Sequence, residues 1–441
     1  MTIAKLLKAA PSIAVFAWFA ASGSCPAQDE KKPAAPKEEV KDETKEVLKD
    51  QVDPTANLPR LTLGECLAIA YDRQPAIRAA FHSYNAVMSG DRALYNLPSI
   101  AERVAPDLPI RKEQSKRGLL VATAEISKIR QETTQDVIVL YYSYVYAKQQ
   151  EQTAGDVLEQ MEIYYEVAEG MVKSGARVPG MKLNQFSLYA LQNVIAEVRA
   201  QKLKAGTGSK LAIEAIKDTM GVDPSFVFLP AAKQLPEMLT GTVTLEQVMA
   251  ESLNRRPELM MAAAGVDAFR LEVCAQAKIK YKFTVPTLGA GSDLHSKQLP
   301  IAVRNGDYRP GPIVPEMPTT LVGKTADRVA KATELSLRQD ALYERAVSLI
   351  RLEAANAFLK WEAASIRVRE AKIRFDRGRR MVEESRSAAV AKQDAELLVT
   401  NEALAGKAQA EYVEAVYEHI KTLAALERVT GGGILAQFPE R

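Results

Sequence analysis

Residues 137–172 read VIVLYYSYVYAKQQEQTAGDVLEQMEIYYEVAEGMV. Taking alternately every third and fourth residue selects side chains that are apolar, except for the carboxylate of Glu151. Because an α-helix repeats every 3.6 residues, this spacing places them along one narrow seam, as in a coiled coil. The pattern predicts a helix over about residues 119–173, roughly 80 Å long. The seam residues are Val137, Leu140, Tyr144, Ala147, Glu151, Ala154, Leu158, Met161, Tyr165, Ala168 and Val172.

The composition of the whole chain agrees with long helices. Of 441 residues only 6% are aromatic, and Gly and Pro are modest in number. Such usage is typical of long helices rather than of two or three ordinary globular domains. The formal net charge is +3, and loss of the leader lysines Lys5 and Lys8 would lower it by two to +1. A charge so close to neutral gives no reason to expect nucleic-acid binding.

The first 27 residues resemble an export signal. Lys5 and Lys8 precede an apolar core at residues 9–21, and small residues before Gln28 offer a cleavage site. We therefore predict a signal peptide at residues 1–27. The core is too short for a spanning helix of about 20 residues, although an N-terminal anchor is an alternative. Residues 22–25 also resemble a lipoprotein cleavage box, so lipidation of Cys25 stays open, even though the usual large aliphatic residue is missing.

Residues 28–60 are rich in Lys, Glu, Ala and Pro and have few large apolar side chains. Such a segment cannot bury enough surface to offset the entropy of ordering, so we predict a disordered linker. Structure is expected to begin at Leu61, where Thr62 and Glu65 form a capping-box pattern. Pro75 is expected to end or kink the helix that follows, because its ring removes a backbone donor.

This opening returns later in the chain. Residues 61–75 read LTLGECLAIAYDRQP, and residues 243–257 read VTLEQVMAESLNRRP. The offset is 182 residues, and five positions are identical. The sequence therefore predicts two tandem repeats at residues 61–242 and 243–433, followed by a C-terminal tail at residues 434–441.

Each repeat is expected to contain an opening helix, a Pro-containing break, a very long helix, a short tip and a returning helix. The breaks are expected at residues 96–110 and 281–323. The second long helix has its own apolar seam, which includes Ile350, Trp361 and Phe375, and its returning helix ends at three consecutive glycines, 431–433. Gly206 and Gly208 should weaken the first returning helix.

With these elements in place, the chain resembles the TolC family of outer-membrane efflux proteins. The resemblance covers about residues 61–430. It depends on the twin openings, on Leu97-Pro98-Ser99 after the first helix, and on the closing segment YVEAVYEHIKTLAALERVTG at residues 412–431. The fold expected from it is mainly α, with long antiparallel coiled-coil helices in two tandem repeats and short or degenerate β-hairpin insertions.

The resemblance implies a transport function. Members of that family are homotrimers that form an efflux conduit through the periplasm and the outer membrane, with a periplasmic adaptor protein and an inner-membrane transporter as partners. It implies no catalytic step, so the chain is expected not to be an enzyme.

The sequence departs from that family where membrane strands should lie. A hairpin of spanning strands needs more than about 20 residues, and residues 96–110 are too few and contain three prolines. Six prolines interrupt residues 281–323. The alternative function is therefore a non-conducting periplasmic helical scaffold that has lost the membrane β-barrel.

No motif for chemistry is present in the sequence. His82, His295 and His419 are scattered and match no metal-ligand spacing, and no cofactor motif is complete. Cys66 and Cys274 lie in helical patterns and are expected to be buried. We therefore predict no catalytic, metal or cofactor site.

The two helix tips are the candidate contact sites for an adaptor, since the end of a tunnel must meet its partner. The predicted contact residues are Gly175, Val178 and Pro179 in the first tip and Ala388, Ala389 and Val390 in the second. The alternative is that these residues are simply turns.

Overall fold

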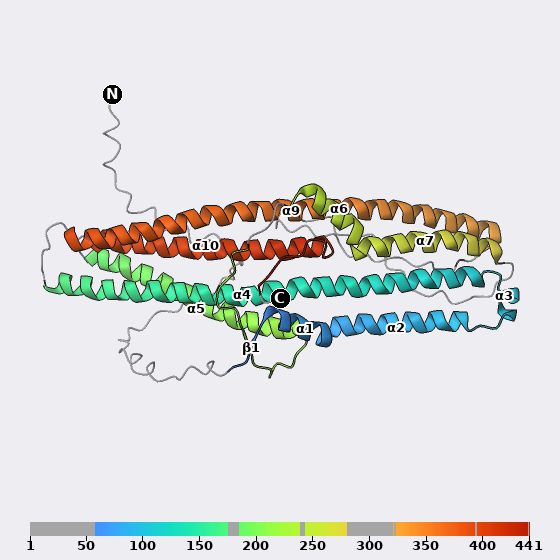
Figure 1. Cartoon of the computed structure of the whole chain (residues 1–441), viewed down its shortest axis with the longest axis horizontal. Helices are drawn as coiled ribbons and strands as arrows, with labels where there is room; N and C mark the ends of the chain where they lie inside the picture. Colours follow the sequence, from blue (N-terminus) through green and yellow to red (C-terminus); the bar gives the residue numbers. More distant parts are fainter. Residues whose placement is uncertain are drawn as a thin grey trace, which may run out of the picture. The chain divides into compact units, whose positions relative to one another are not determined.

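The computed structural model describes residues 58–174, 185–238, 243–279, 321, 323–392, 395–439 and 441. This part of the chain is almost entirely helical (Figure 1). The helices are α1 Leu63–Arg73, α2 Pro75–Tyr95, α3 Ile100–Val104, α4 Leu108–Ser174, α5 Gln185–Met220, α6 Leu245–Arg255, α7 Pro257–Lys278, α9 Thr325–Lys392 and α10 Ala395–Val429. Two short strands, β1 Arg60–Leu61 and β2 Leu229–Pro230, pair in parallel.

Two rods dominate the structure. Helix α4 has 67 residues and α9 has 68, so each is about 100 Å long. Helix α4 includes the predicted seam, and none of its eleven seam residues is exposed. It begins at Leu108, well before the predicted start near residue 119. Pro109 lies in its first turn, where a missing backbone N–H leaves no hydrogen bond unmade, and so does not break the helix.

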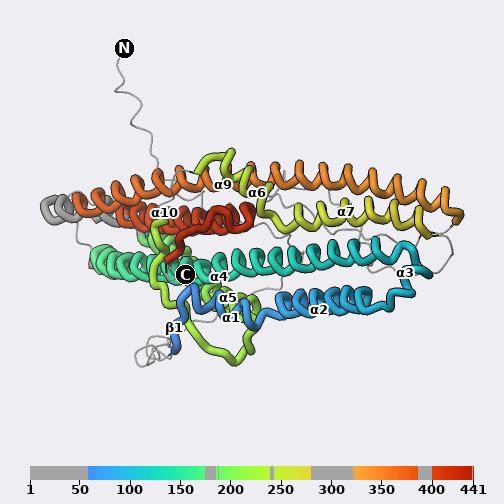
Figure 2. The backbone as a smooth tube through the Cα atoms, turned by 45° about the vertical axis from the view of Figure 1, so that its right-hand side comes forward, coloured from blue at the N-terminus to red at the C-terminus, as the bar shows by residue number. Residues whose placement is uncertain are grey.

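The helices are ordered side by side. Helices α7 and α10 both pack between α9 and α4, whereas α2 and α5 pack on α4 (Figures 1 and 2). Helix α9 is therefore one edge of the bundle, and α2 together with α5 forms the other. The long helix of each repeat packs on its returning helix, α4 on α5 and α9 on α10, as the two seams predicted.

The duplication is visible in local structure. The side chain of Thr62 accepts a hydrogen bond from the backbone N–H of Glu65 at the start of α1, and Thr244 repeats this capping box with Gln247 at the start of α6. Helix α1 ends before Pro75 and α6 ends before Pro257, and both prolines occupy the first turn of the next helix. The predicted interruption at Pro75 is confirmed.

In each repeat a glycine directly after the returning helix packs against the end of the opening helix, just before its proline. Gly221 follows α5 with φ +65°, and Gly431 follows α10 with φ +60°. A Cβ on Gly221 would lie 2.7 Å from the carbonyl oxygen of Arg73, and one on Gly431 would lie 2.7 Å from that of Arg255. Only glycine fits both the backbone conformation and the close approach.

The main core is built from buried residues of α1, α4, α5, α9 and α10. Tyr141 of α4 is fully buried there, donating its hydroxyl hydrogen to the carbonyl oxygen of Leu61 and accepting the N–H of Ala232. The C-terminal residues also join this core, because Phe438 is buried and its ring lies 5.6 Å from that of Tyr142. The predicted tail at residues 434–441 is thus packed against the helices over its described residues.

The first break contains no strand. Residues 96–107 hold the five-residue helix α3 between α2 and α4. Most of the second break, residues 280–320, lies outside the described residues, as do the predicted signal peptide and most of the linker.

Candidate functional site

The predicted contact residues of the two tips fall wholly or partly outside the described residues. Gly175, Val178 and Pro179 lie outside the described residues. The backbone of Ala388, Ala389 and Val390 forms the last turns of α9, which runs to Lys392, but their side chains are outside the described part. Cys25 and His295 are outside it as well.

The remaining histidines and cysteines are far from forming a metal site. His82 is exposed on α2, while His419 of α10 is buried and its Nε2 lies 3.1 Å from the hydroxyl of Ser365. Burial raises the pKa of the Cys66 thiol to about 12. Cys274 is exposed, so the prediction that both cysteines are buried is wrong for it, since it lies on the outer side of α7. Across the described ranges, no group of three potential ligands could hold a metal ion.

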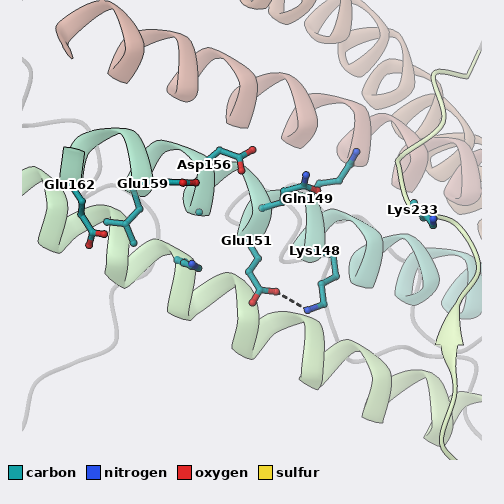
Figure 3. A pocket seen from close by; sticks show the side chains of 11 residues that line it. Lys148, Gln149, Glu151, Asp156, Glu159, Glu162 and Lys233 are labelled. Carbon is teal, nitrogen blue, oxygen red and sulfur yellow. Dashed lines mark hydrogen bonds and ion pairs between the residues drawn. The ribbon is translucent and has the colours of Figure 1, made fainter. Parts of the chain in front are cut away.

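An open polar groove of about 560 Å³ runs between α4 and α5 (Figure 3). Its charged lining mixes four carboxylates with three lysines, and one pair, Lys148 and Glu151, is 2.8 Å apart. It has no histidine, serine or cysteine in its lining, so it offers neither a nucleophile nor a base tuned to neutral pH. The charged residues that line it are Lys148, Glu151, Asp156, Glu159, Glu162, Lys202 and Lys233.

This groove explains the polar interruption in the α4 seam. A Cβ on Gly206 of α5 would lie 3.1 Å from Oε1 of Glu151, so the glycine leaves space for the carboxylate. On the facing helix, a Cβ added to Gly155 of α4 would lie 3.5 Å from the Nζ atom of Lys202. The glycines and the seam carboxylate are therefore one packing arrangement, which the sequence showed only as two separate irregularities.

A buried ion cluster joins α7, α9 and α10. Arg256 donates to both carboxylate oxygens of Glu258 at 2.8 and 2.9 Å and lies 2.9 Å from Glu353. Arg428 of α10 donates to the other oxygen of Glu353 at 2.6 Å. Burial by itself would raise the pKa of Glu258, but the charge and hydrogen bonds of Arg256 outweigh it, and the pKa lies below the ordinary value.

A second polar network fastens the other end of α7. Glu272 is fully buried and accepts hydrogen bonds from Arg111 and Gln114 of α4. Gln276 bonds Glu272 at 2.6 Å and accepts from Arg328 of α9 at 2.9 Å. Burial would raise the pKa of Glu272, but the hydrogen bond and charge of Arg111 lower it overall. These carboxylates are held ionised by arginines, so they position helices and do not act as proton donors.

The sequence analysis missed both clusters. Their charged residues look like those of any solvated helix face. One signal was available in the repeat alignment, where Arg256 stands opposite Gln74 and Glu258 opposite Ala76.

Helix α9 has an apolar stripe that nothing in the described structure covers. Four of its large apolar side chains recur every seven residues, and each is between 43% and 58% exposed. They lie about 200° around the helix from the seam that packs on α10, because two residues separate the two rows. This stripe, named here the α9 stripe, consists of Leu352, Leu359, Ile366 and Ile373.

The opposite edge has a matching apolar surface. Helix α5 exposes small and apolar side chains at helical spacing, and its large residues are between 56% and 76% exposed. Soluble monomers seldom expose apolar rows of this length, and such rows mark contact surfaces. This surface, named here the α5 stripe, consists of Phe186, Tyr189, Ala196, Ala200, Leu203 and Leu211.

Comparison with known proteins gives similarity at the level of structure. No family model and no curated protein matches the sequence. The solved structure of the outer-membrane channel OprN superposes with a TM-score of 0.62 at 16% identity, covering 87% of this chain and 96% of that one. CusC, whose structures describe transmembrane channel formation, gives 0.63 at 14% identity over 92% and 99% of the two chains.

The Neisseria gonorrhoeae MtrE outer membrane channel gives 0.62 at 16% identity, over 84% of this chain and 89% of that one. The TolC-like, mainly helical fold that the sequence indicated is therefore confirmed. None of the described helices has both the length and the apolar character needed to cross a bilayer.

Proposed function

We propose that this chain is a subunit of an efflux conduit in the bacterial envelope. Copies of the chain, three as in the family that it resembles, would associate side by side into a hollow helical tube. Substrate would pass through the tube, and a periplasmic adaptor and an inner-membrane transporter would supply specificity and energy. The protein itself would carry out no chemical step.

The observation that carries this proposal is the pair of uncovered edges. The α9 stripe and the α5 stripe lie on opposite sides of the bundle, separated by α10 and α4. Two different edges that match each other make a head-to-tail contact, and repeated contacts of this kind form a ring when the rotation between copies closes. In such a ring α5 would lie between α4 and the next copy's α9, as α10 lies between α4 and α9 within one chain.

Blocking one edge at a time tests the ring. Leu359→Glu with Ile366→Glu blocks the α9 stripe, and Leu203→Glu with Leu211→Glu blocks the α5 stripe. Native mass measurement should show a closed oligomer for the wild type and monomers for each variant alone. A mixture of the two variants should give dimers only, because one competent contact remains. Val227→Glu, at an exposed position in the loop after α5, is the control and should leave the oligomer intact.

Equal oligomer size in all variants would contradict the edge assignment. A wild-type monomer would contradict the tube itself.

A second candidate function follows from residues 96–107, which contain the short helix α3 and no strand. This observation favours a periplasmic helical scaffold that assembles in the same way but does not conduct. Single-channel recording in planar bilayers separates the two. Discrete conductance steps that disappear with the α9-stripe variant support the conduit, and an assembled but silent particle supports the scaffold.

The adaptor contact is proposed at the two tips, at Gly175, Val178 and Pro179 and at Ala388, Ala389 and Val390. Val178→Asp with Val390→Asp should abolish capture of an adaptor protein while leaving helicity by circular dichroism unchanged. Retained capture would place the contact elsewhere.

We also propose that the chain is exported and resides at the outer membrane or in the periplasm. Fractionation of cells that express the wild type and Cys25→Ser tests this location. A shift from membrane to soluble periplasm in the variant would indicate lipidation of Cys25, and cytoplasmic retention of the wild type would contradict export.

A further inference from the structure

The two repeats can be aligned helix by helix, because equivalent helices begin at constant offsets. Helix α4 begins at Leu108 and α9 at Thr325, an offset of 217 residues (325 less 108). Helix α5 begins at Gln185 and α10 at Ala395, an offset of 210 (395 less 185), and the same 210 residues separate the glycines that follow them. Every residue of α4 and α5 therefore has a defined equivalent in α9 and α10.

Within one chain, two hydrogen bonds record the register in which α10 packs on α4. The Nε2 atom of Gln150 in α4 donates to the carbonyl oxygen of Ala410 in α10 at 2.9 Å. The Nε2 atom of Gln409 in α10 donates to the hydroxyl of Thr153 in α4 at 3.2 Å. This contact joins the long helix of one repeat to the returning helix of the other.

The same register can be applied between copies, with α5 in the place of α10 and α9 in the place of α4. The equivalents of Gln409 and Thr153 are then Arg199 of α5 and Glu370 of α9. A neutral hydrogen bond within the chain is thus replaced by two side chains of opposite charge.

The transferred register also agrees with the exposed surfaces. The equivalents of Gln150 and Ala410 are Arg367 and Ala200. Ala200 belongs to the α5 stripe, and Arg367 directly follows Ile366 of the α9 stripe. The contact between repeats therefore brings together the two stripes that were identified from exposure alone.

Both charged side chains are available for such a contact. The side chain of Arg199 is 62% exposed, and its Nη2 lies 2.5 Å from Glu162 of the same chain, which leaves other N–H groups of the guanidinium to donate. Glu370 is exposed and has no ion-pair partner in the part of the chain that the structure describes.

We propose that α5 of one copy packs on α9 of the next in the register in which α10 packs on α4, and that Arg199 of one copy pairs with Glu370 of the next. The inference rests on the ring of copies proposed above and specifies how its members are aligned. Arg367 and Arg374 lie one turn to either side of Glu370. A slip by one turn in either direction would place Arg199 against another arginine, so the pair selects one register.

Charge reversal tests the pair. Arg199→Glu and Glu370→Arg should each weaken assembly by about five-fold or more, because each places like charges between copies. The two changes combined in one chain should restore assembly to within about three-fold of the wild type. The measurement is the protein concentration at which half of the oligomer dissociates, from native mass measurement of a dilution series.

A matched variant separates this pair from the one within the chain. Arg199→Glu with Glu162→Arg restores an ion pair inside one copy but leaves two carboxylates facing each other between copies. This combination should assemble as poorly as Arg199→Glu alone. Rescue by Glu162→Arg but not by Glu370→Arg would overturn the proposal.

A disulfide tests the register directly. Within the chain, a Cβ added to Gly406 would lie 3.8 Å from the Cβ of Val157, a distance that a disulfide spans. Their equivalents between copies are Ala196 of α5 and Arg374 of α9. On oxidation, Ala196→Cys with Arg374→Cys should link copies and give a ladder of covalent oligomers on a non-reducing gel.

Two further cysteine pairs are the controls, all in a background of Cys25→Ser and Cys274→Ser. Val157→Cys with Gly406→Cys should close within one chain and give no ladder. Ala196→Cys with Arg367→Cys, two turns away from the proposed register, should give no ladder either.

The outcomes distinguish the register from the ring. A closed wild-type oligomer without a ladder from the Ala196→Cys, Arg374→Cys variant would overturn the register and leave the ring intact. A wild-type monomer would overturn both.

Discussion

Helices α2 and α7 occupy the same place in the two repeats but have opposite surroundings. Both begin with a proline after a capped helix, yet α2 buries only Ile77 and Ala80, whereas α7 buries thirteen residues. The returning helices differ in the same sense: α5 exposes four large apolar side chains and the described part of α10 exposes one, Leu404. Among these helices, repeat 1 thus supplies the outer pair, α2 and α5, and repeat 2 the inner pair, α7 and α10.

The comparison shows which helix surfaces are apolar but not covered by another described helix. Helix α7 has exchanged apolar positions for arginine-paired carboxylates that fit between α9 and α4. Helix α5 has kept an apolar outer face although nothing in the described structure covers it. An exposed helix whose outer face is as apolar as that of a buried helix is expected to contact another subunit.

The largest expected difference between the repeats concerns Arg256. Arg256→Met would leave Glu258 and Glu353 buried without that partner and should cost about 3–5 kcal/mol of unfolding free energy. The matched change in repeat 1, Gln74→Met, should cost less than about 0.5 kcal/mol, because Gln74 belongs to no ion cluster. Denaturant unfolding of both variants checks this. Equal losses would mean that the buried cluster does not distinguish the repeats.

Substitution of Gly221 and of Gly431, the glycines that follow the two returning helices, should by contrast cost the same stability in both repeats. Gly221→Ala and Gly431→Ala should each cost about 3 kcal/mol, because both need positive φ and would place Cβ against a backbone carbonyl. The control is Gly170→Ala in α4, where no atom lies within 4 Å of the added carbon, and it should stabilise the helix by up to about 1 kcal/mol. Thermal unfolding followed by circular dichroism gives all three values. Tolerance at only one of the two closing positions would argue against their equivalence.

The capping threonines offer a smaller and again symmetrical effect. Thr62→Ala and Thr244→Ala should each cost about 1 kcal/mol, because each removes the acceptor for a backbone N–H in the first turn. Thr→Ser at the same positions keeps that acceptor and should be nearly neutral. A cost confined to one repeat, measured by urea unfolding, would show that the other cap is not formed.

The smallest expected effect is a dependence of stability on pH that only repeat 2 should show. His419 and Ser209 occupy equivalent positions in the two returning helices, because each lies twelve residues before the glycine that follows its helix, Gly431 or Gly221. Burial lowers the pKa of His419 below 6.5, so the unfolded chain binds the proton more readily than the folded one. This contribution to stability is complete above about pH 6.5 and declines as the pH falls below that value.

The variant His419→Ser, which copies repeat 1, should remove this pH dependence. Its unfolding midpoint should change less than that of the wild type between pH 7.5 and pH 5.5. The carboxyl pKa values of Glu258 and Glu272 are lowered, so these groups do not titrate in the folded protein over that interval. An identical decline in both proteins would assign the acid sensitivity to other groups.

Periodicity alone was sufficient to predict the rods and their partners. The seam of α4, the capping boxes and the break at Pro75 all follow from spacing and from the chemistry of single residues. The start of α4 was placed too late because Pro109 was interpreted as part of a break. A proline in a first turn and one in a loop look alike without the neighbouring hydrogen bonds.

The buried clusters and the edges could not be predicted in this way. Glu353 is one of many charged residues in α9, and its burial depends on the helices packed beside it. The α9 stripe is one residue in seven, too sparse to be distinguished from the scattered apolar residues of any surface. Both features depend on which helix lies beside which, and local sequence does not encode that order.

The ion cluster at Arg256 also makes the two halves non-interchangeable. If the start of α7 carried the repeat 1 residues, a glutamine and an alanine would stand in place of Arg256 and Glu258, and the carboxylate of Glu353 would lose one of its two cations. The start of α2 therefore cannot replace the start of α7 without loss of part of the cluster. A molecule built on two similar repeats has in this way acquired two different edges, α9 on one side and α2 with α5 on the other, and with them the direction in which the proposed assembly would add further copies.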